Sequence, residues 1–332
     1  MPARAHYNPR AMRILFITST RIGDAVLSSG LLAHLIERNP EARITLACGA
    51  APSPLFEAAP GLDRLVVLVK TPLGGHWRKL WLACAARRWD MVVDLRRTGI
   101  AWMLMAGERL RLGPAERGLH KVQQYARVFG LEETPPAPRL WTAASHETAA
   151  AHLIPEGPPV LAVGPTANWR GKEWRPERFA ELAARLTGAG GPLAGARVAV
   201  FAGPGERDRA RPVLEAVPEA RRIDLTGAVV LPTAHAFLAR CACFVGNDSG
   251  LMHLAAAAGA PTLGLFGPSR DEHYAPWGEA AAVVRTTQSY DELVGAPGYD
   301  HRETDTLMDG LSVEAAAEAA AALLARVGAR AA

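Results

Sequence analysis

Short apolar runs alternate with longer amphipathic stretches through the first half of the chain. The runs predict strands over 13–18, 44–48, 65–69 and 91–95, and the stretches predict helices over about 23–38 and 77–88. Nearly every position in these runs is apolar, instead of every second one, which predicts strands that are covered on both faces. Strands that alternate with helices in this way indicate a parallel sheet with helices on both sides.

The second half repeats this pattern as a separate cycle. It predicts strands over 160–163, 198–202, 241–246 and 262–266, and helices over 176–186, after residue 206 and over 312–327. Between the two cycles, residues 134–159 are rich in proline, alanine and glutamate, which is typical of a domain junction. A chain of 332 residues also suits two domains of about 150 residues each.

We therefore predict an α/β protein built from two Rossmann-like, doubly wound parallel-sheet domains, an N-terminal one over 1–150 and a C-terminal one over 151–332. Ligands of such sheets bind beyond the carboxyl ends of the strands. The loops that follow the strands of both domains are then predicted to face each other across a central cleft. The chemistry of the protein is expected in those loops.

The loop after the third predicted strand of the second half is the most informative one. Residues 247–250, Asn-Asp-Ser-Gly, lead directly into a helix of small residues that contains His253. A helix start presents unpaired N–H groups and the positive end of the helix dipole, which together attract an anion such as phosphate. Gly250 has no Cβ to hold a phosphate at a distance. The alternative is that Asp248 and Ser249 only cap the helix.

Two further loops carry candidate chemistry. In the loop after the first strand, Gly23 and Asp24 open a helix, where the dipole stabilises an ionised carboxylate that could act as general base for a hydroxyl group. The first loop of the second half contains Lys172, the only lysine beyond Lys121. A flexible cation near a diphosphate can follow the charge that grows on a leaving group. The alternatives are a helix-start aspartate and a solvated lysine.

Three segments resemble glycosyltransferase family 9, the ADP-heptose:lipopolysaccharide heptosyltransferases. They are ILFITSTRIGDAVLSSGLLAHL from residue 14, the K-x-W-x-P that begins at Lys172, and NDSGLMHLAAAAGAPTLGLFGPS from residue 247. The resemblance extends over nearly the whole chain and implies the GT-B architecture, in which two Rossmann-like domains face a cleft. The chain departs from the family pattern at Arg175, which separates Trp174 from Pro176.

The resemblance also implies a reaction and roles for residues. The reaction is inverting transfer of heptose from ADP-heptose to an anionic lipopolysaccharide core acceptor, with Asp24 as general base and Lys172 beside the departing diphosphate. The residues that it assigns to the donor are Thr166, Asn168, Lys172, Glu206, Asp248, Ser249, Gly250, Leu251 and His253. The residues that it assigns to the acceptor are Thr20, Gly23, Arg96 and Arg97.

Other interpretations of the same residues stay open. The chemistry could use a different nucleotide diphosphate-sugar, because the motifs report the nucleotide more firmly than the sugar. A non-catalytic nucleotide-sugar binding protein of envelope assembly would need no general base, so the joint presence of Asp24, Lys172, Asp248 and His253 argues against it. A dehydrogenase is the weakest alternative, because the first strand is not followed by G-x-G-x-x-G and the G-x-G-x-x-D around Glu206 is only faintly similar.

Charge is distributed unevenly along the chain. The formal net charge is +4, yet residues 76–130 contain eleven lysines and arginines against four acids. Trp77, Trp81, Trp89 and Trp102 lie among these cations, a combination that suits an anionic lipid surface. The alternative is a solvated basic face without a partner; a nucleic-acid partner is not expected, since no binding motif accompanies the charge. With a lipid-linked acceptor implied by the resemblance, we expect peripheral association with the cytoplasmic face of the inner membrane.

Composition excludes several kinds of site. Cys48, Cys84, Cys241 and Cys243 are scattered and are expected to be buried, reduced thiols. The chain has neither a D-x-D motif nor paired histidines, so we expect no metal and no cofactor.

The chain also has no apolar stretch of the ~20 residues that a membrane span needs. Because the first residues lack the pattern of a signal peptide, we expect a cytoplasmic protein.

Overall fold

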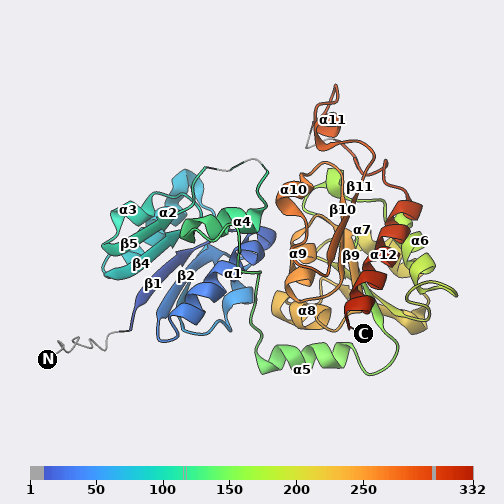
Figure 1. Ribbon diagram of the computed structural model, residues 1–332, viewed down its shortest axis with the longest axis horizontal. Coiled ribbons are helices and arrows are strands. Elements are labelled where there is room, and N and C mark those ends of the chain that lie inside the picture. Colours follow the sequence, from blue (N-terminus) through green and yellow to red (C-terminus); the bar gives the residue numbers. More distant parts are fainter. Residues whose placement is uncertain (1–10, 115, 117, 301–303, 332) are drawn as a thin grey trace.

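The computed structural model describes residues 11–114, 116, 118–300 and 304–331, and it forms two α/β domains side by side (Figure 1). The first ten residues, on which the expectation about a signal peptide partly rests, lie outside this range. The strands of the N-terminal sheet are β1 (Arg13–Ile17), β2 (Arg43–Gly49), β3 (Leu62–Leu68), β4 (Trp89–Asp94) and β5 (Ala106–Arg111). Their order is β3-β2-β1-β4-β5, and all neighbours pair in parallel.

Helices cover both faces of this sheet. The helices α1 (Ile22–Arg38) and α4 (Lys121–Ala126) lie on one face, and α2 (Gly75–Cys84) and α3 (Ile100–Met103) lie on the other. Strand β1 buries Ile14 and Phe16 in the core under α1, and Leu15 and Ile17 in the core under α2. Because alternate residues of a strand point to opposite faces, a strand with two covered faces is apolar at every position.

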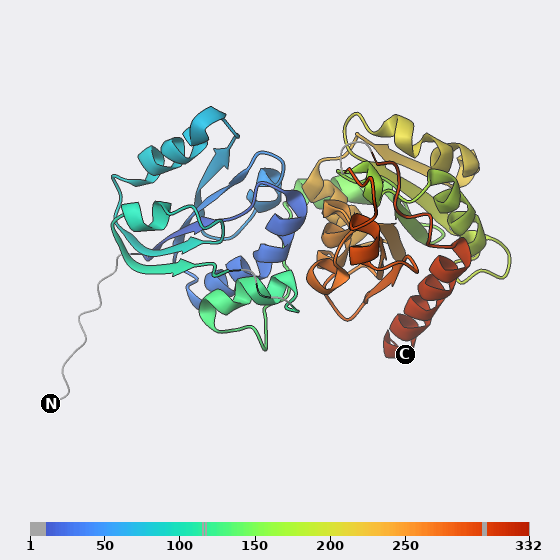
Figure 2. The same cartoon turned by 90° about the horizontal axis from the view of Figure 1, so that it is seen from above.

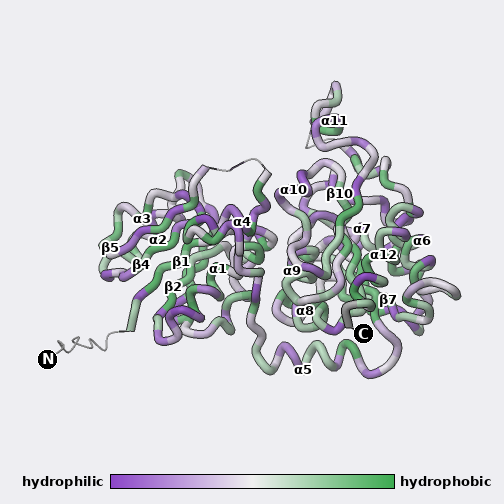
Figure 3. Tube along the Cα trace, in the orientation of Figure 1, coloured by the Kyte–Doolittle hydropathy of each residue, from purple (hydrophilic) through white to green (hydrophobic). Residues whose placement is uncertain are grey.

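The C-terminal sheet is a second, larger version of the same design. Its strands are β6 (Val160–Gly164), β7 (Arg197–Ala202), β8 (Arg222–Thr226), β9 (Cys243–Asn247), β10 (Thr262–Phe266) and β11 (Ala281–Arg285). The order β11-β10-β9-β6-β7-β8, all parallel, is that of a Rossmann dinucleotide-binding sheet. The central strands are buried along their length and mostly apolar (Figure 3).

Helices also cover both faces of the second sheet. One face carries α6 (Pro176–Thr187), α7 (Arg207–Ala216) and α12 (Val313–Ala331), and the other carries α8 (Leu231–Leu238) and α9 (Gly250–Ala257). The short helices α10 (Asp271–Tyr274) and α11 (Tyr290–Val294) follow β10 and β11, and α5 (Ala144–Leu153) joins the domains and packs on α8. Short 3₁₀ helices lie at Ser53–Phe56, Pro72–Gly74, Arg127–Phe129, Arg170–Lys172 and Glu219–Arg221.

The predicted fold class is confirmed, and each strand predicted from an apolar run is present. The sequence does not predict β5 or β8, because these partly buried edge strands lack a continuous apolar run. The edge strand β11 was also not predicted, although four consecutive residues of that strand are apolar. Helix α5 lies within the predicted junction, and the boundary predicted at residue 150 falls inside it. None of the helices that the structure describes is both long enough and apolar enough to cross a membrane.

The basic segment over 76–130 differs in part from its prediction. Trp89 is buried, and its indole N–H donates to the carbonyl of Cys84 at 3.1 Å. The side chain of Arg109 is also bound within the fold, because its guanidinium donates hydrogen bonds to three backbone carbonyls around α3. Trp89 thus joins the sheet to α2, and Arg109 joins it to α3, so these two side chains are not part of a lipid-facing surface. The four cysteines are buried and free, as predicted.

The domains meet where α1 and α9 begin. A Cβ added to Gly23 would lie 2.8 Å from Cδ2 of His253, and one added to Gly250 would lie 2.8 Å from Cβ of Ile22. Only glycine at both positions therefore lets the two helix starts come this close. The hydrophobic core under α1 continues through this contact into α8 and α9.

Two histidines add polar contacts across the same boundary. His120 donates from Nε2 to the carbonyl of Ala275 at 2.9 Å, and Nδ1 of His273 donates to the carbonyl of Leu119 at 2.9 Å. The His120 ring also lies 4.7 Å from the ring of Trp277. Burial lowers the pKa of His120 to about 4, so this ring is neutral in the native protein at neutral pH.

Acidification is predicted to destabilise the protein through His120. Between the ordinary histidine pKa of about 6.5 and the native value of about 4, the unfolded chain binds a proton that the native protein does not. The free energy of unfolding therefore falls as the pH drops through this window. His120→Gln should make that dependence shallower by up to about 1.4 kcal/mol per pH unit, as measured by urea unfolding. His152→Gln, at an exposed position of α5, is the control; equal pH dependence in both variants would contradict the assignment.

Candidate active site

The predicted site residues gather where the strand order of each sheet changes direction. This point lies between β1 and β4 in the N-terminal sheet and between β6 and β9 in the C-terminal sheet. Ligands of open α/β sheets bind beyond the carboxyl ends of the strands at such a point. Thr20 and Asp24 follow β1, Arg96 follows β4, Lys172 follows β6, and Asp248 follows β9. Both switch points thus carry polar side chains toward the domain boundary.

Asp248 is the centre of the C-terminal half of the site. Its side chain is almost fully buried, and it forms a short ion pair with the ammonium group of Lys172. Nε2 of His253 lies 3.9 Å from Oδ1 of the same carboxylate. Burial lowers the pKa of His253 to about 4, and the nearby Asp248 only partly opposes this effect. His253 is therefore a neutral hydrogen-bonding group beside a charged pair at neutral pH.

The start of α9 is not closed by its own side chains. Ser249 occupies the N-cap position, but its side chain caps no backbone N–H group. Its hydroxyl oxygen and Nδ1 of His253 are both buried without a hydrogen-bond partner among the described residues. Buried polar atoms are rarely left unpaired. The capping alternative therefore fails here: Asp248 holds Lys172, and the Ser249 hydroxyl remains available to a ligand.

Gly250 has a structural role that was not expected. The Cβ that it lacks would meet Ile22 of α1, so the glycine is needed for the approach of the two domains. Leu251 follows in the first turn of α9, where backbone N–H groups have no partner within the helix.

The loop that carries Lys172 is held by a buried carboxylate that sequence analysis missed. Glu173 is 1% exposed and accepts hydrogen bonds from the Ala167 N–H at 2.9 Å and from Arg170 at 3.0 Å. It also forms a short ion pair with Arg209 of α7. A charge that is removed from water must be compensated in this way. The loop after β6 is therefore fixed from within the domain, and Lys172 is the part of it that reaches Asp248.

Arg175, the extra residue in the K-x-W-x-P motif, is accommodated at the protein surface. Trp174 is buried, and its backbone N–H donates to Oδ1 of Asn247 at 3.0 Å. Arg175 turns outward, where Nε donates to Oδ1 of Asp309 at 2.6 Å. Pro176 still begins α6, as predicted. The departure from the family pattern leaves Lys172 in contact with Asp248.

The other donor candidates lie around this centre with different exposure. Thr166 is buried at the end of β6, whereas Asn168 is exposed. Glu206 stands at the start of α7, where its carboxylate accepts from the Gly203 N–H at 2.9 Å and pairs with Arg209 at 2.6 Å. The carboxylate of Glu206 thus already has a hydrogen bond and an ion pair with its own loop and helix.

Asp24 is the centre of the N-terminal half of the site. It lies in the first turn of α1, and the buried hydroxyl of Tyr125 donates a hydrogen bond to its carboxylate. Arg96 lies beside it, with Nη1 at 3.3 Å from Oγ of Ser19 and 3.5 Å from Oγ1 of Thr20. Sequence analysis missed Tyr125, because nothing in α4 marks it as a partner of a distant loop.

One side chain connects the two halves. Burial raises the pKa of Tyr274, and the carboxylates of Asp24 and Asp248 raise it further. Both carboxylates therefore act on the same phenol, although they belong to different domains. Together with the contact of the two helix starts at Gly23 and Gly250, this effect places Asp24 and the candidate anion site on the two sides of the same domain boundary.

Arg97 is not brought to this centre in the same way as Arg96. The buried Asp94 carboxylate accepts from the backbone N–H groups of Arg96 at 2.9 Å and Thr98 at 2.8 Å, which fixes the loop after β4. Arg97 adopts a left-handed conformation with φ of 56°. Its side chain is exposed, and no hydrogen bond or ion pair in the described part of the chain joins it to Asp24.

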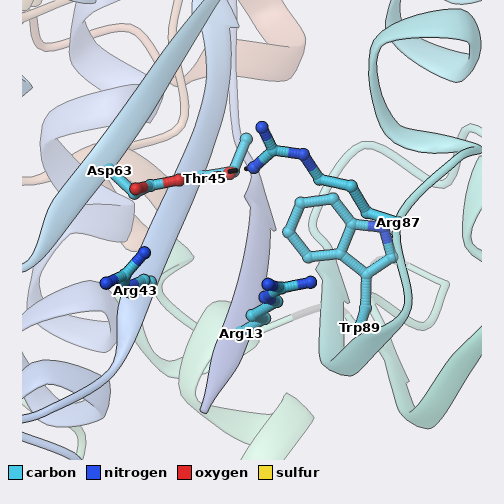
Figure 4. Close-up of a pocket in the computed structure, with 6 residues that line it drawn as sticks. All are labelled: Arg13, Arg43, Thr45, Asp63, Arg87 and Trp89. Carbon is cyan, nitrogen blue, oxygen red and sulfur yellow. Dashed lines mark hydrogen bonds and ion pairs between the residues drawn. The ribbon is translucent and has the colours of Figure 1, made fainter. Parts of the chain in front are cut away.

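A pocket elsewhere does not offer comparable chemistry. A volume of about 300 Å³ lies at the amino ends of β1–β4, opposite the edge that carries the site. Figure 4 shows its lining, in which Arg87 reaches toward Asp63 and Arg13 and Arg43 stand on neighbouring strands. Its one carboxylate already pairs with Arg87 at 3.3 Å. In the described residues, no group of three or more histidine, cysteine, aspartate or glutamate side chains could hold a metal ion.

Two wound sheets whose carboxyl edges meet at the domain boundary, with Asp24 on one side and the start of α9 on the other, have the architecture of the GT-B class of glycosyltransferase. The family model of glycosyltransferase family 9 (heptosyltransferase) matches residues 108–295. The chain belongs to this family and is a glycosyltransferase. The family resemblance of the sequence motifs is thereby confirmed.

Relatives and solved structures agree with this assignment. The lipopolysaccharide heptosyltransferase 2 of Escherichia coli K12 is 26% identical over 322 residues, which cover 85% of this chain and 90% of that protein. The solved ADP-heptose lipopolysaccharide heptosyltransferase II of E. coli has a TM-score of 0.74 at 22% identity, covering 96% of this chain and 100% of that one. A family 9 glycosyltransferase from Veillonella parvula has a TM-score of 0.77 at 23% identity, covering 95% and 99%.

The candidate anion site leads to a binding prediction. Lys172→Gln should weaken ADP binding about tenfold or more, because a cation beside a diphosphate contributes a charge-assisted contact. Isothermal titration calorimetry measures this directly. Lys79→Gln removes the same charge from an exposed position of α2 and should leave the affinity unchanged. Equal affinities of Lys172→Gln and wild type would show that this ammonium group does not contact the diphosphate.

Proposed function

We propose that this glycosyltransferase moves heptose from ADP-heptose to an anionic lipopolysaccharide core acceptor, with inversion at the anomeric carbon. The observation that carries the proposal is the contact between the starts of α1 and α9 at Gly23 and Gly250, which brings Asp24, in the first turn of α1, up to the candidate anion site across the domain boundary. The substrates follow from the relatives, which are named lipopolysaccharide heptosyltransferase 2.

The C-terminal half binds the donor in this proposal. The Ser249 hydroxyl and the first N–H groups of α9, at Gly250 and Leu251, contact the diphosphate, supported by the unpaired state of that hydroxyl. Lys172 exchanges its Asp248 partner for a phosphate oxygen, and Asp248 with neutral His253 then orients the donor. Thr166 and Asn168 add polar contacts to the phosphates, and Glu206 reaches the adenosine ribose once it leaves its loop partners.

The N-terminal half binds the acceptor and activates it. Thr20, Gly23, Arg96 and Arg97 line the acceptor position around Asp24. The carboxylate of Asp24 takes the proton of the acceptor hydroxyl, whose oxygen forms a bond to the anomeric carbon. The bond from that carbon to the diphosphate breaks on the opposite face, and its electron pair leaves with ADP. Lys172 and the α9 amides stabilise the negative charge that develops on the diphosphate.

Donor entry requires the domains to separate. Asp248 and His253 are almost fully buried, and the α1 and α9 starts are in contact at Gly23 and Gly250. A nucleotide-sugar reaches the Ser249 hydroxyl only when this contact opens. Closure then brings Asp24 to the acceptor and excludes water, as in other enzymes with moving domains.

The proposal also covers cofactor and location. Lys172 and the helix N terminus provide positive charge at the diphosphate, so the scheme uses no metal and no resident cofactor. A lipid-linked acceptor places the reaction at the cytoplasmic face of the inner membrane, with the protein bound peripherally. The basic segment over 76–130 and the absence of a membrane-crossing helix among the described residues agree with that arrangement.

Asp24→Asn should lower turnover by about 10²–10⁴-fold, because the amide cannot accept the hydroxyl proton. ADP release from ADP-heptose with a truncated, lipid-linked inner-core acceptor measures turnover, and ADP affinity should stay at the wild-type value. Asp208→Asn, at an exposed position of α7, is the control and should be fully active. Wild type that binds ADP but releases none from ADP-heptose would point to a different donor or acceptor or to a non-catalytic binding protein.

Tyr125→Phe should lower kcat about tenfold and leave the KM for ADP-heptose unchanged. The substitution keeps the buried ring and removes only the hydrogen bond to Asp24, and such a bond to a charged group contributes about 1.5–3 kcal/mol. Steady-state kinetics separate the two constants. Tyr290→Phe removes a phenol in α11, remote from Asp24, and should match wild type. An unchanged kcat in Tyr125→Phe would show that the hydrogen bond does not orient the base.

A further inference from the structure

Exposed apolar side chains are concentrated on one part of the described molecule. Seven of the large ones lie in the N-terminal domain: Val67, Val69, Leu73, Leu82, Trp102, Met103 and Met105. Among the described residues, Val230 is the one other large apolar side chain with comparable exposure, and it lies in the C-terminal domain. A contiguous apolar surface on a soluble domain usually marks an interaction site.

Most of these residues belong to one layer of the fold. Val67 is the exception, because Val66 and Leu68 of β3 face the core under α2 and Val67, between them, points to the other face of the sheet. Helices α2 and α3 pack on the same face of the N-terminal sheet, over the core that contains Leu80 and Ile100. The indole N–H of Trp81 donates to the carbonyl of Met103 at 3.4 Å, which joins the two helices. This layer lies on the side of the sheet away from the C-terminal domain (Figure 2). Its outer surface, with the loop from β3 to α2, is called the α2–α3 face below.

Leu73 is the most unusual residue of the α2–α3 face. It is fully exposed, and its φ of 53° places it in the left-handed region that glycine normally occupies. Gly74 follows with φ of 71°, so the β3–α2 loop reverses sharply at this point. A left-handed conformation is costly for a branched apolar residue. The chain thus holds a leucine in a costly conformation at the tip of this loop, where its side chain does not pack in the core of the protein.

Cations surround the exposed apolar residues, and acids are missing. Residues 64–89 contain six lysines and arginines and no aspartate or glutamate, and residues 95–107 also lack acids. Lys70, Arg78 and Lys79 are exposed and form no ion pair with any described residue. On α2, Arg78 and Lys79 precede Leu82 by about one turn, so cations and an apolar side chain share its outer face.

We propose that the α2–α3 face docks on an anionic lipid bilayer, with Leu73 and Trp102 among the acyl chains and the neighbouring cations against the headgroups. Apolar side chains flanked by basic residues are the combination that binds such a surface. This inference rests on the proposed function, which requires a lipid-linked acceptor. The loop that carries Leu73 follows β3 at the carboxyl edge of the sheet, the same edge that carries Thr20 and Arg96. Docking there brings the bilayer next to the acceptor loops.

Vesicle binding by the full chain tests the proposal. Wild type should sediment with vesicles that contain phosphatidylglycerol and phosphatidylcholine, and added salt should weaken this binding. Leu73→Asn combined with Trp102→Ser should reduce the bound fraction at least tenfold, and asparagine tolerates the left-handed backbone. Val230→Asn removes an exposed apolar side chain from the other domain and should bind as wild type does. Unchanged vesicle binding by the double variant would overturn the proposal.

Two further measurements separate docking from catalysis and from self-association. The double variant should keep wild-type turnover on an acceptor without acyl chains and lose it on the acceptor embedded in vesicles. If wild type turns over neither acceptor but the vesicle-binding pattern holds, the transfer reaction is wrong and the docking surface stands. If wild type ignores anionic vesicles but forms a dimer that Leu73→Asn disrupts, the face is a contact between two copies and the lipid proposal is wrong.

Discussion

The contact between the first turns of α1 and α9 is the constraint on which the site depends. Gly23 faces His253 and Gly250 faces Ile22, at distances that no Cβ could tolerate. This approach brings two helix N termini together, so that positive dipole ends from both domains point into one small region. Negative groups are favoured in this region. Asp24, in the first turn of α1, and Asp248, just before the start of α9, are the carboxylates that lie beside it.

The buried charges of the site are balanced by partners that a substrate can replace. Asp248 is compensated by Lys172, whereas Glu173 is held permanently by backbone and arginine donors in the same loop. Burying an ion pair costs desolvation energy that its own attraction only partly offsets. A diphosphate that binds between Lys172 and the start of α9 can accept hydrogen bonds from both the ammonium group and the unpaired Ser249 hydroxyl. The structure thus combines a fixed scaffold with an exchangeable ion pair.

Sequence patterns predicted the parts of this structure that depend on local order along the chain. The central strands contain nearly continuous apolar runs, and Asp24, Lys172 and Asp248 follow the ends of strands, so the strands and these residues could be predicted from the sequence. Edge strands such as β5 were not predicted, because one side of each faces solvent and the sequence there is less apolar. The hydrogen bond from Tyr125 to Asp24 also escaped, because only the folded topology brings α4 beside α1. The contact of Gly250 with Ile22 could not be predicted, since it depends on a neighbour in the other domain.

A crystal structure with an unreactive fluorinated analogue of ADP-heptose would test the central claim most directly, namely that one site forms across the domain boundary. The account predicts phosphate oxygens within hydrogen-bonding distance of the Ser249 hydroxyl and Lys172, with the anomeric carbon facing Asp24. A nucleotide bound away from the start of α9, or a sugar turned away from Asp24, would contradict it.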